Sequence, residues 1–148
     1  MKPPLLLLHG AIGSKEQFVP LVQLLQNDFE IHQLNFSGHG GAPMSEHFSI
    51  EQFAQEVLNY LNEHKIECIN IFGYSMGGYV ALWLALHHPD RIVKIYTFAT
   101  KWRWSPSIAQ KETCVCHNYI FLYASTSLGA DCETNPAKRF CGKFRFPR

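Results

Sequence analysis

The sequence predicts an α/β fold in which a parallel sheet carries helices on both faces, a doubly wound arrangement. Two observations predict it. Short apolar runs rich in strand-forming residues alternate along the chain with segments whose apolar residues recur at helical spacing. The first of these runs is apolar without alternation, as expected of a strand buried on both faces. The 148 residues, of which 47% are hydrophobic and 17% charged, suit a single globular domain.

Four strands are expected in this alternation. They are the stretches PLLLLHG (4–10), EIHQLNF (30–36), CINIF (68–72) and RIVKIYTFAT (91–100). Right-handed crossovers place them in the order second, first, third, fourth across the sheet. YIFLYAS (119–125) is a candidate for a fifth strand. Cys68 opens the third stretch and is expected to be a buried structural thiol.

Three helices are expected between these strands. The first begins near Pro20, because proline is tolerated in the first turn of a helix. The second begins after Ser49, which forms a capping box with Gln52 ahead of an apolar stripe. The third covers residues 76–88 and is apolar almost all round, so it is expected to be buried, and Pro89 ends it.

The overall charge and the absence of long apolar segments exclude several classes of function. A net charge of +1 gives no general case for binding nucleic acid or an anionic membrane. The leucine run after Lys2 is shorter than the apolar core of a signal peptide, and no stretch reaches the roughly 20 apolar residues of a membrane span. The expected compartment is the cytoplasm.

The stretch Gly73-Tyr74-Ser75-Met76-Gly77-Gly78 places a serine between the third strand and the third helix. Glycines two residues before and two after the serine allow the helix to approach the strand closely. The serine hydroxyl is then exposed at the carboxyl edge of the sheet, and the N–H of Met76 points into the same space. The spacing therefore predicts that Ser75 is a nucleophile, although a serine that only caps the helix is the alternative.

Two histidines follow the first and second strands. His9-Gly10-Ala11 ends the first strand, and Gly10 lets the backbone turn so that the N–H of Ala11 can serve as a second oxyanion donor. His39 lies in the glycine-rich turn SGHGGAP (37–43). We expect both histidines to stabilise their loops by hydrogen bonds rather than to transfer protons.

The three stretches LLLLHGAIGS, LNFSGHGGAP and GYSMGGYVALWLALHHPDRI together resemble the α/β-hydrolase superfamily over about residues 4–104. The resemblance implies a serine hydrolase that acts on an ester or related acyl substrate. It implies Ser75 as nucleophile and the N–H groups of Met76 and Ala11 as the oxyanion hole, with Gly10, Gly73 and Gly77 as the elbow and loop glycines. An aspartate and an arginine are common in this family where the chain has Asn35 and Ser37. No metal or cofactor is implied.

The general base that would activate Ser75 is not found in the sequence. In the family it is a histidine that follows an acidic residue, and both come after the serine. His87 and His88 lie at the far end of the elbow helix, roughly 18 Å from Ser75 for His87. His117, Asp131 and Glu133 lie in the last part of the chain, in the wrong order. We therefore expect a truncated form with little activity, or a non-catalytic remnant that acts by binding.

The chain changes character near residue 113. Residues 1–112 form the expected partial hydrolase domain, and residues 113–148 form an atypical, basic tail expected to be loop or disordered. A frame-shifted, alternatively spliced or truncated end would each produce such a change, and the sequence does not decide whether the tail is native, spliced or frame-shifted. The tail holds five potential zinc ligands, Cys114, Cys116, His117, Cys132 and Cys141, with a spacing that disfavours a structural site. Without later strands the fourth strand would be an apolar edge, so self-association is expected unless residues 119–125 cover it.

Overall fold

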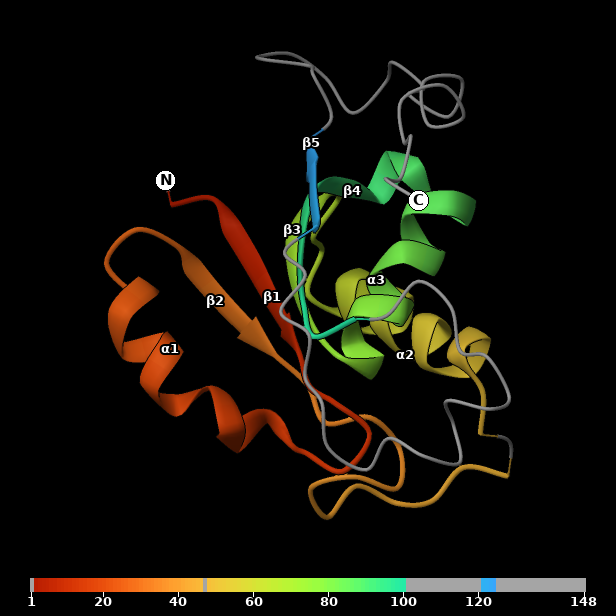
Figure 1. Ribbon diagram of the computed structural model, residues 1–148. Helices are drawn as coiled ribbons and strands as arrows, with labels where there is room; N and C mark the ends of the chain where they lie inside the picture. The colour runs from red at the N-terminus through yellow and green to blue at the C-terminus, as the bar shows by residue number, and fades with distance from the viewer. Residues whose placement is uncertain (1, 47, 101–120, 125–148) are drawn as a thin grey trace, which may run out of the picture.

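The computed structural model describes residues 2–46, 48–100 and 121–124, and shows one five-stranded sheet in the order β2-β1-β3-β4-β5 (Figure 1). The first four strands are parallel, and β5 is antiparallel to β4. The predicted order of the first four strands is confirmed. The strands are β1 (Pro4–Leu8), β2 (Glu30–Gln33), β3 (Ile69–Tyr74), β4 (Ile92–Phe98) and β5 (Phe121–Ala124).

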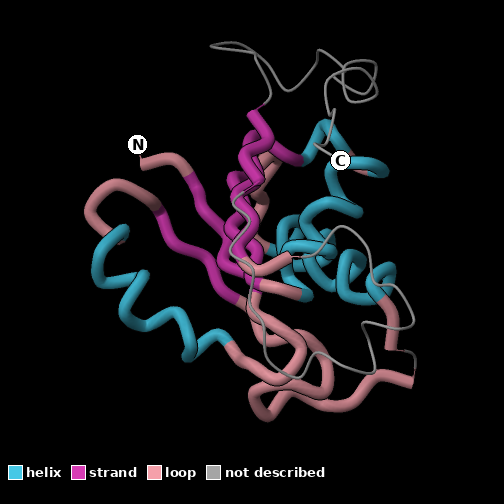
Figure 2. The backbone as a smooth tube through the Cα atoms, viewed as in Figure 1, coloured by secondary structure: helices cyan, strands magenta, loops and turns pink. Residues whose placement is uncertain are grey.

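Helices cover both faces of the sheet, so the predicted doubly wound arrangement is also confirmed (Figure 2). The short helix α1 (Val19–Leu25), preceded by a 3-10 turn η1 (Lys15–Phe18), packs on one face. The helices α2 (Ile50–Glu63) and α3 (Met76–His87) pack on the other, and a 3-10 turn η2 (Pro89–Arg91) leads into β4.

The position of β1 between two helix layers explains why its sequence is apolar without alternation. Leu6 and Leu8 belong to the larger core under α2 and α3, whereas Leu5 and Leu7 belong to the smaller core under α1. All four side chains are buried. A central parallel strand with helices on both sides requires apolar residues at every position.

Three expectations about single elements are corrected. Strand β2 ends at Gln33 rather than at residue 36, because the N–H of Phe36 donates to the ring of His9 instead of to β1. Helix α3 is not buried all round: Leu86 is 64% exposed, since only the sides that face the sheet and α2 are covered. Cys68 lies just before β3 and is half-buried.

The cap of α2 forms only in part. The hydroxyl of Ser49 accepts a hydrogen bond from the N–H of Gln52 at 3.1 Å, as predicted. The Gln52 side-chain amide lies 3.5 Å from a carboxylate oxygen of Glu56 and does not turn back to Ser49 as a full capping box requires. None of the described helices is long and apolar enough to cross a membrane.

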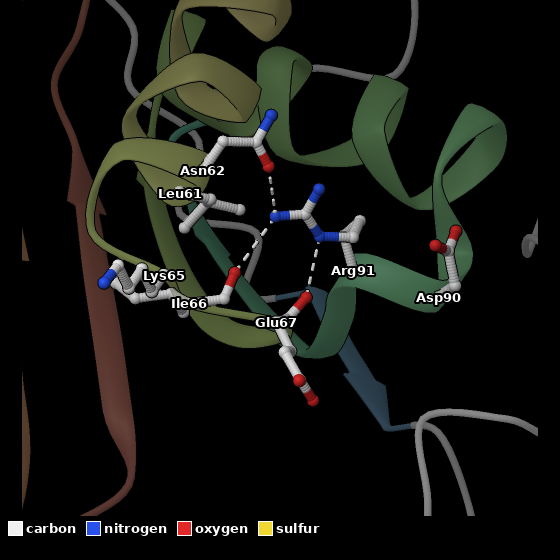
Figure 3. Close-up of a pocket in the computed structure, with 7 residues that line it drawn as sticks. All are labelled: Leu61, Asn62, Lys65, Ile66, Glu67, Asp90 and Arg91. Atoms are coloured by element: carbon white, nitrogen blue, oxygen red, sulfur yellow. Dashed lines mark hydrogen bonds between the residues drawn. The ribbon is translucent and has the colours of Figure 1, made fainter.

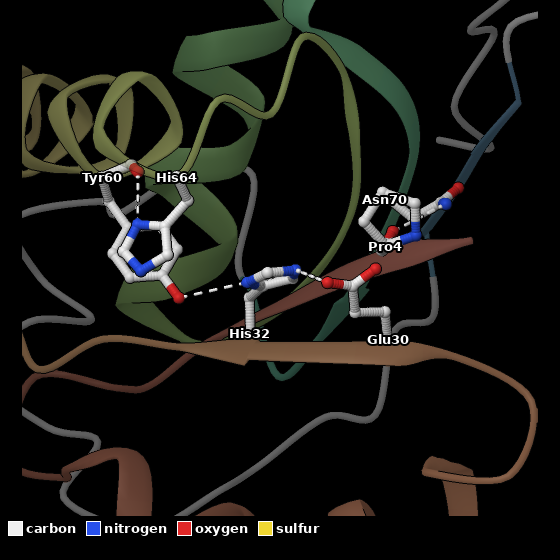
Figure 4. A network of polar contacts seen from close by, with 6 residues as sticks. All are labelled: Pro4, Glu30, His32, Tyr60, His64 and Asn70. Carbon is white, nitrogen blue, oxygen red and sulfur yellow. Dashed lines mark hydrogen bonds and ion pairs between the residues drawn. The ribbon is translucent and has the colours of Figure 1, made fainter. Parts of the chain in front are cut away.

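Polar side chains join the edge strand β2 to α2 (Figure 4). The Nδ1 atom of His32 lies 3.2 Å from the hydroxyl of Tyr60, and Nε2 lies 3.6 Å from a carboxylate oxygen of Glu30. The ring of Tyr60 stacks on His64 with centroids 4.0 Å apart. Strand β2 is thus tied to the helix layer by side chains as well as to β1 by its backbone.

Candidate active site

Ser75 lies at the turn between β3 and α3, at the carboxyl edge of the sheet. Its φ of 50° and ψ of −111° put it in a region that non-glycine residues rarely adopt, at a cost of roughly 1–3 kcal/mol. The neighbouring strand holds it there, because the N–H of Ser75 donates to the carbonyl of Phe98 at 2.9 Å. The expected elbow geometry is present, whereas the nucleophilic role of Ser75 stays a prediction.

The two elbow glycines are required by the close approach of backbone segments. A Cβ on Gly73 would lie 2.6 Å from the carbonyl oxygen of Gly77, and a Cβ on Gly77 would lie 2.2 Å from the carbonyl oxygen of Leu8. Backbone atoms inside a sheet and a helix cannot move aside to admit a methyl group. The spacing of glycine around Ser75 therefore follows from how α3 packs on β1 and β3.

Ser75 lies next to the two segments that carry the predicted oxyanion donors. Met76 is the first residue of α3, so its N–H has no acceptor within the helix. The loop that carries Ala11 runs beside the elbow: a Cβ placed on the neighbouring Gly10 would lie only 3.4 Å from the Cβ of Ser75. The carbonyl of His9 also accepts the N–H of Gly77 at 3.1 Å. The fold thus brings the serine close to the two segments that carry the predicted oxyanion donors, whereas the oxyanion role of these N–H groups stays a prediction.

His9 is fully buried, and both of its ring nitrogens are engaged. Nε2 accepts the N–H of Phe36 at 3.1 Å, so Nδ1 carries the hydrogen and donates it to the carbonyl of Gly10 at 2.8 Å. Burial lowers the pKa of His9 below its ordinary value, and His39 nearby acts in the same direction. His9 therefore stays neutral and shapes the loop, as the sequence predicts, and it is not available to Ser75 as a base.

Two further side chains join the loop after β1 to the glycine-rich turn after β2. Asn35 accepts the N–H of Lys15 at 2.7 Å and donates to the carbonyl of Gly40 at 3.0 Å. The ring nitrogens of His39 lie next to the carbonyls of Ser37 and Ala11. Both histidines and Asn35 thus brace the segment that presents the Ala11 N–H.

Helix α2 supports the same turn through a carboxylate. Glu56 accepts the N–H of Ser37 at 3.0 Å through Oε2 and the hydroxyl of Ser37 through Oε1. Sequence reasoning missed this contact, because nothing in the spacing of the two residues connects them. It also shows what Ser37 does at the position where the family commonly has arginine.

Within residues 2–46 and 48–100 no histidine is placed to take the proton of Ser75. The ring nitrogens of His9 and His39 are engaged with backbone groups. His87 and His88 are at the far end of α3, and His32 and His64 lie between β2 and α2. His117, Asp131 and Glu133, which the sequence places in the wrong order for a triad, lie outside the described residues. So do Cys114, Cys116, Cys132 and Cys141, and the described part of the chain holds no cluster of ligands that could bind a metal ion.

A hollow of about 510 Å³ lies at the opposite edge of the sheet, around the end of α2 and the start of β4 (Figure 3). The guanidinium of Arg91 there donates to the carbonyl of Glu67 at 2.7 Å, and to the carbonyl of Ile66 and the side chain of Asn62 at 3.0 Å each. These bonds fix the corner between α2 and β3. The hollow is remote from Ser75 and takes no part in the site.

Comparison with known proteins agrees with this geometry. A family model described as alpha/beta hydrolase fold matches residues 3–112. The chain is 37% identical over 95 residues to a "Probable alcohol acetyltransferase" of Cyberlindnera fabianii, covering 60% of this chain and 25% of that protein. It is 32% identical over 108 residues to a "Pimeloyl-[acyl-carrier protein] methyl ester esterase" of Vibrio vulnificus, covering 69% of this chain and 41% of that protein.

Solved structures give the same result. A "Marine microorganism esterase" matches with a TM-score of 0.66 and 28% identity, over 74% of this chain and 44% of that one. A hydrolase from Pseudomonas aeruginosa matches with a TM-score of 0.69 and 26% identity, over 74% and 41%. The chain thus spans about a quarter to two fifths of the length of the two curated relatives named above. With the fold, the elbow and the matched residues in agreement, this chain belongs to the alpha/beta hydrolase fold family.

Proposed function

We propose that this chain carries the nucleophile and the oxyanion donors of a serine hydrolase that acts on an ester or related acyl substrate. The observation that supports this most directly is the strained backbone of Ser75 at the start of α3, beside the loop that carries Ala11. Strain at a position of this kind persists where the surrounding structure enforces it, and it is typical of functional residues. The esterase names of two relatives support an ester as the substrate class.

The chemistry follows from these groups. The Oγ atom of Ser75 attacks the ester carbonyl carbon while its proton passes to a general base, and the carbonyl oxygen becomes an oxyanion held by the N–H groups of Met76 and Ala11. The C–O bond then breaks, the alcohol leaves with the proton, and water releases the acid from the acyl-enzyme. The described residues do not supply the base, so we propose that the chain by itself reacts slowly.

The test compares the chain with Ser75→Ala in nitrophenyl acetate hydrolysis and in labelling by a fluorophosphonate, with the labelled peptide identified by mass spectrometry. We expect little Ser75-dependent hydrolysis, because no described residue serves as the base. We still expect slow labelling of Ser75, because oxyanion donors without a triad can retain a rate advantage of about 10³–10⁴-fold over water in a formed site. Labelling that is complete within minutes would reveal a base, and His117 would be the first residue to replace. No labelling of Ser75 after a day in excess probe would contradict the proposal.

Acyl transfer to an alcohol is a second candidate, favoured by the printed name of one relative, an alcohol acetyltransferase. The same acyl-enzyme would serve, with an alcohol in place of water as the acceptor. Adding ethanol to the nitrophenyl acetate reaction and measuring ethyl acetate by gas chromatography distinguishes the two. Ester formation that exceeds the Ser75→Ala background would favour the transferase reaction, and acetate alone would favour hydrolysis.

A further inference from the structure

Thr100 follows the end of β4 and its hydroxyl contacts the elbow. The side chain is buried, 2% exposed, and Oγ1 donates to the carbonyl of Ser75 at 3.1 Å. The preceding residue Ala99 has a φ of 57°, and this left-handed turn ends β4 and places Thr100 beside the elbow. No sequence motif identified Thr100, because a threonine after a strand has no characteristic spacing from the serine.

The carbonyl that Thr100 contacts belongs to the same peptide unit as the N–H of Met76. A peptide unit is planar, with its C=O and N–H pointing in opposite directions. The carbonyl of Ser75 also accepts the N–H of Gly78 at 3.0 Å. The Thr100 hydroxyl and the Gly78 N–H both donate to the Ser75 carbonyl oxygen and so fix the plane of this peptide unit. The orientation of the plane in turn sets the direction in which the Met76 N–H points.

The second oxyanion donor is held in the same way. The N–H of Ala11 shares a peptide unit with the carbonyl of Gly10, which accepts the N–H of Gly13 at 3.0 Å and the Nδ1–H of His9 at 2.8 Å. Each donor peptide is thus anchored at its carbonyl by one backbone N–H and one buried side chain. Thr100 is the buried side chain that donates to the carbonyl of the Met76 peptide unit, and His9 is the one that donates to the carbonyl of the Ala11 peptide unit.

We propose that Thr100 is a positioning residue, whose hydroxyl holds the Ser75–Met76 peptide so that the Met76 N–H points at the developing oxyanion. The proposal rests on the function proposed above, since it assigns Thr100 a task in that site. It also explains Gly78, because a Cβ there would come within 1.9 Å of the Thr100 Oγ1 atom. Any larger residue at position 78 would displace the hydroxyl.

The first measurement tests the contact without relying on reactivity. The ¹³C′ resonance of Ser75 and the amide resonance of Met76 are compared in the full-length chain, Thr100→Val and Thr100→Ser. We expect both resonances to move in Thr100→Val, which removes the donor and keeps the shape, and to stay near their original positions in Thr100→Ser. Gly78→Ala keeps Thr100, but its added methyl group would occupy the position of the Thr100 hydroxyl. This variant should therefore move the same resonances, and it serves as the test if Thr100→Val does not fold. Unmoved resonances in a folded Thr100→Val or Gly78→Ala chain would overturn the proposal.

The second measurement tests the consequence for the site. The maximal rate and the half-saturating probe concentration of Ser75 phosphonylation are measured separately in the same variants. We expect Thr100→Val to lower the maximal rate about tenfold with little change in half-saturation, less than the 10²–10³-fold cost of losing a donor outright, and Thr100→Ser to restore it. Moved resonances with an unchanged rate would overturn the positioning role. If the unmodified chain labels no faster than Ser75→Ala, the proposed function fails instead, and the resonances still decide whether Thr100 anchors that peptide.

Discussion

At the scale of single residues, the site is built from polar side chains whose partners are backbone groups. Asn35 is the clearest case, because it accepts the N–H of Lys15 and donates to the carbonyl of Gly40. A side-chain amide has both an acceptor and a donor, whereas an ionised aspartate only accepts. The asparagine at a position where the family commonly has aspartate therefore joins two loops that a carboxylate could not join in this way.

Gly77 offers a sharp test of the close approach between α3 and β1. We expect Gly77→Ala to destabilise the chain by about 3 kcal/mol, because its Cβ would meet the backbone carbonyl of Leu8 at 2.2 Å. Gly13→Ala is a matched control: its Cβ would come within 2.1 Å of an atom, but this atom is the end of the flexible Gln17 side chain. Urea unfolding at equal m-value measures both, and equal midpoints for the two variants would contradict the argument.

At the scale of elements, β5 changes the expectation for the sheet edge. The sequence leaves β4 as an apolar edge with unpaired backbone groups unless residues 119–125 cover it. In the structure Phe121–Ala124 pair antiparallel with Lys94–Thr97, so that part of the edge is covered. The other edge of the sheet is β2, a strand of four residues that includes Glu30 and His32, and short, charged edges resist pairing with other chains. Self-association stays a prediction, but its premise, an uncovered apolar edge at β4, holds for only part of that strand.

Disrupting β5 should restore the exposed edge. The double variant Leu122→Pro/Tyr123→Pro removes the N–H groups of two consecutive strand residues, one of which must face β4 because alternate residues point to opposite sides. We expect the variant to self-associate in sedimentation velocity at concentrations where the original chain is monomeric. Thr126→Pro/Ser127→Pro, placed after the strand, is the control. Identical sedimentation of all three chains would show that β5 does not protect the edge.

At the scale of the whole molecule, we expect two histidines on different elements to make stability depend on pH. His9 lies between the loop after β1 and the turn after β2, and His32 lies between β2 and α2. Burial lowers the pKa of each, and the attraction of Glu30 only partly offsets this for His32. Among the described residues, the titratable groups that face His32 are Tyr60 of α2, His64 just after α2 and Glu30 of β2.

The sign of the effect follows from linkage. An unfolded histidine has a pKa of about 6.5, so below that pH the unfolded chain binds protons that the folded chain does not, and stability falls. We expect the thermal midpoint to drop between about pH 7.5 and about pH 5.5, a window above the ordinary pKa of carboxyl groups. His32→Gln should reduce the drop, and Glu30→Gln, which removes the charge that favours protonated His32, should increase it. A midpoint independent of pH in this window, or equal drops in both variants, would contradict the assignment.

The sequence by itself determined the alternation of strands and helices, the order of the first four strands and the place of Ser75 at the turn into α3. These depend on properties that are local or general: apolar periodicity, the glycine spacing around a tight turn, and the handedness of crossovers. The early end of β2 was not predictable, because the ring of His9 from another part of the chain accepts the N–H of Phe36. The half-formed cap of α2 was not predictable either, because the Gln52 side chain lies near Glu56 of the same helix rather than at Ser49. Only the tertiary structure showed that the buried side chains of His9 and Thr100 donate to the carbonyls of Gly10 and Ser75, the peptide units of the two proposed oxyanion donors. Sequence periodicity carries no record of a hydrogen bond such as that from Thr100 to Ser75, 25 positions away, since it depends on how two strand ends meet.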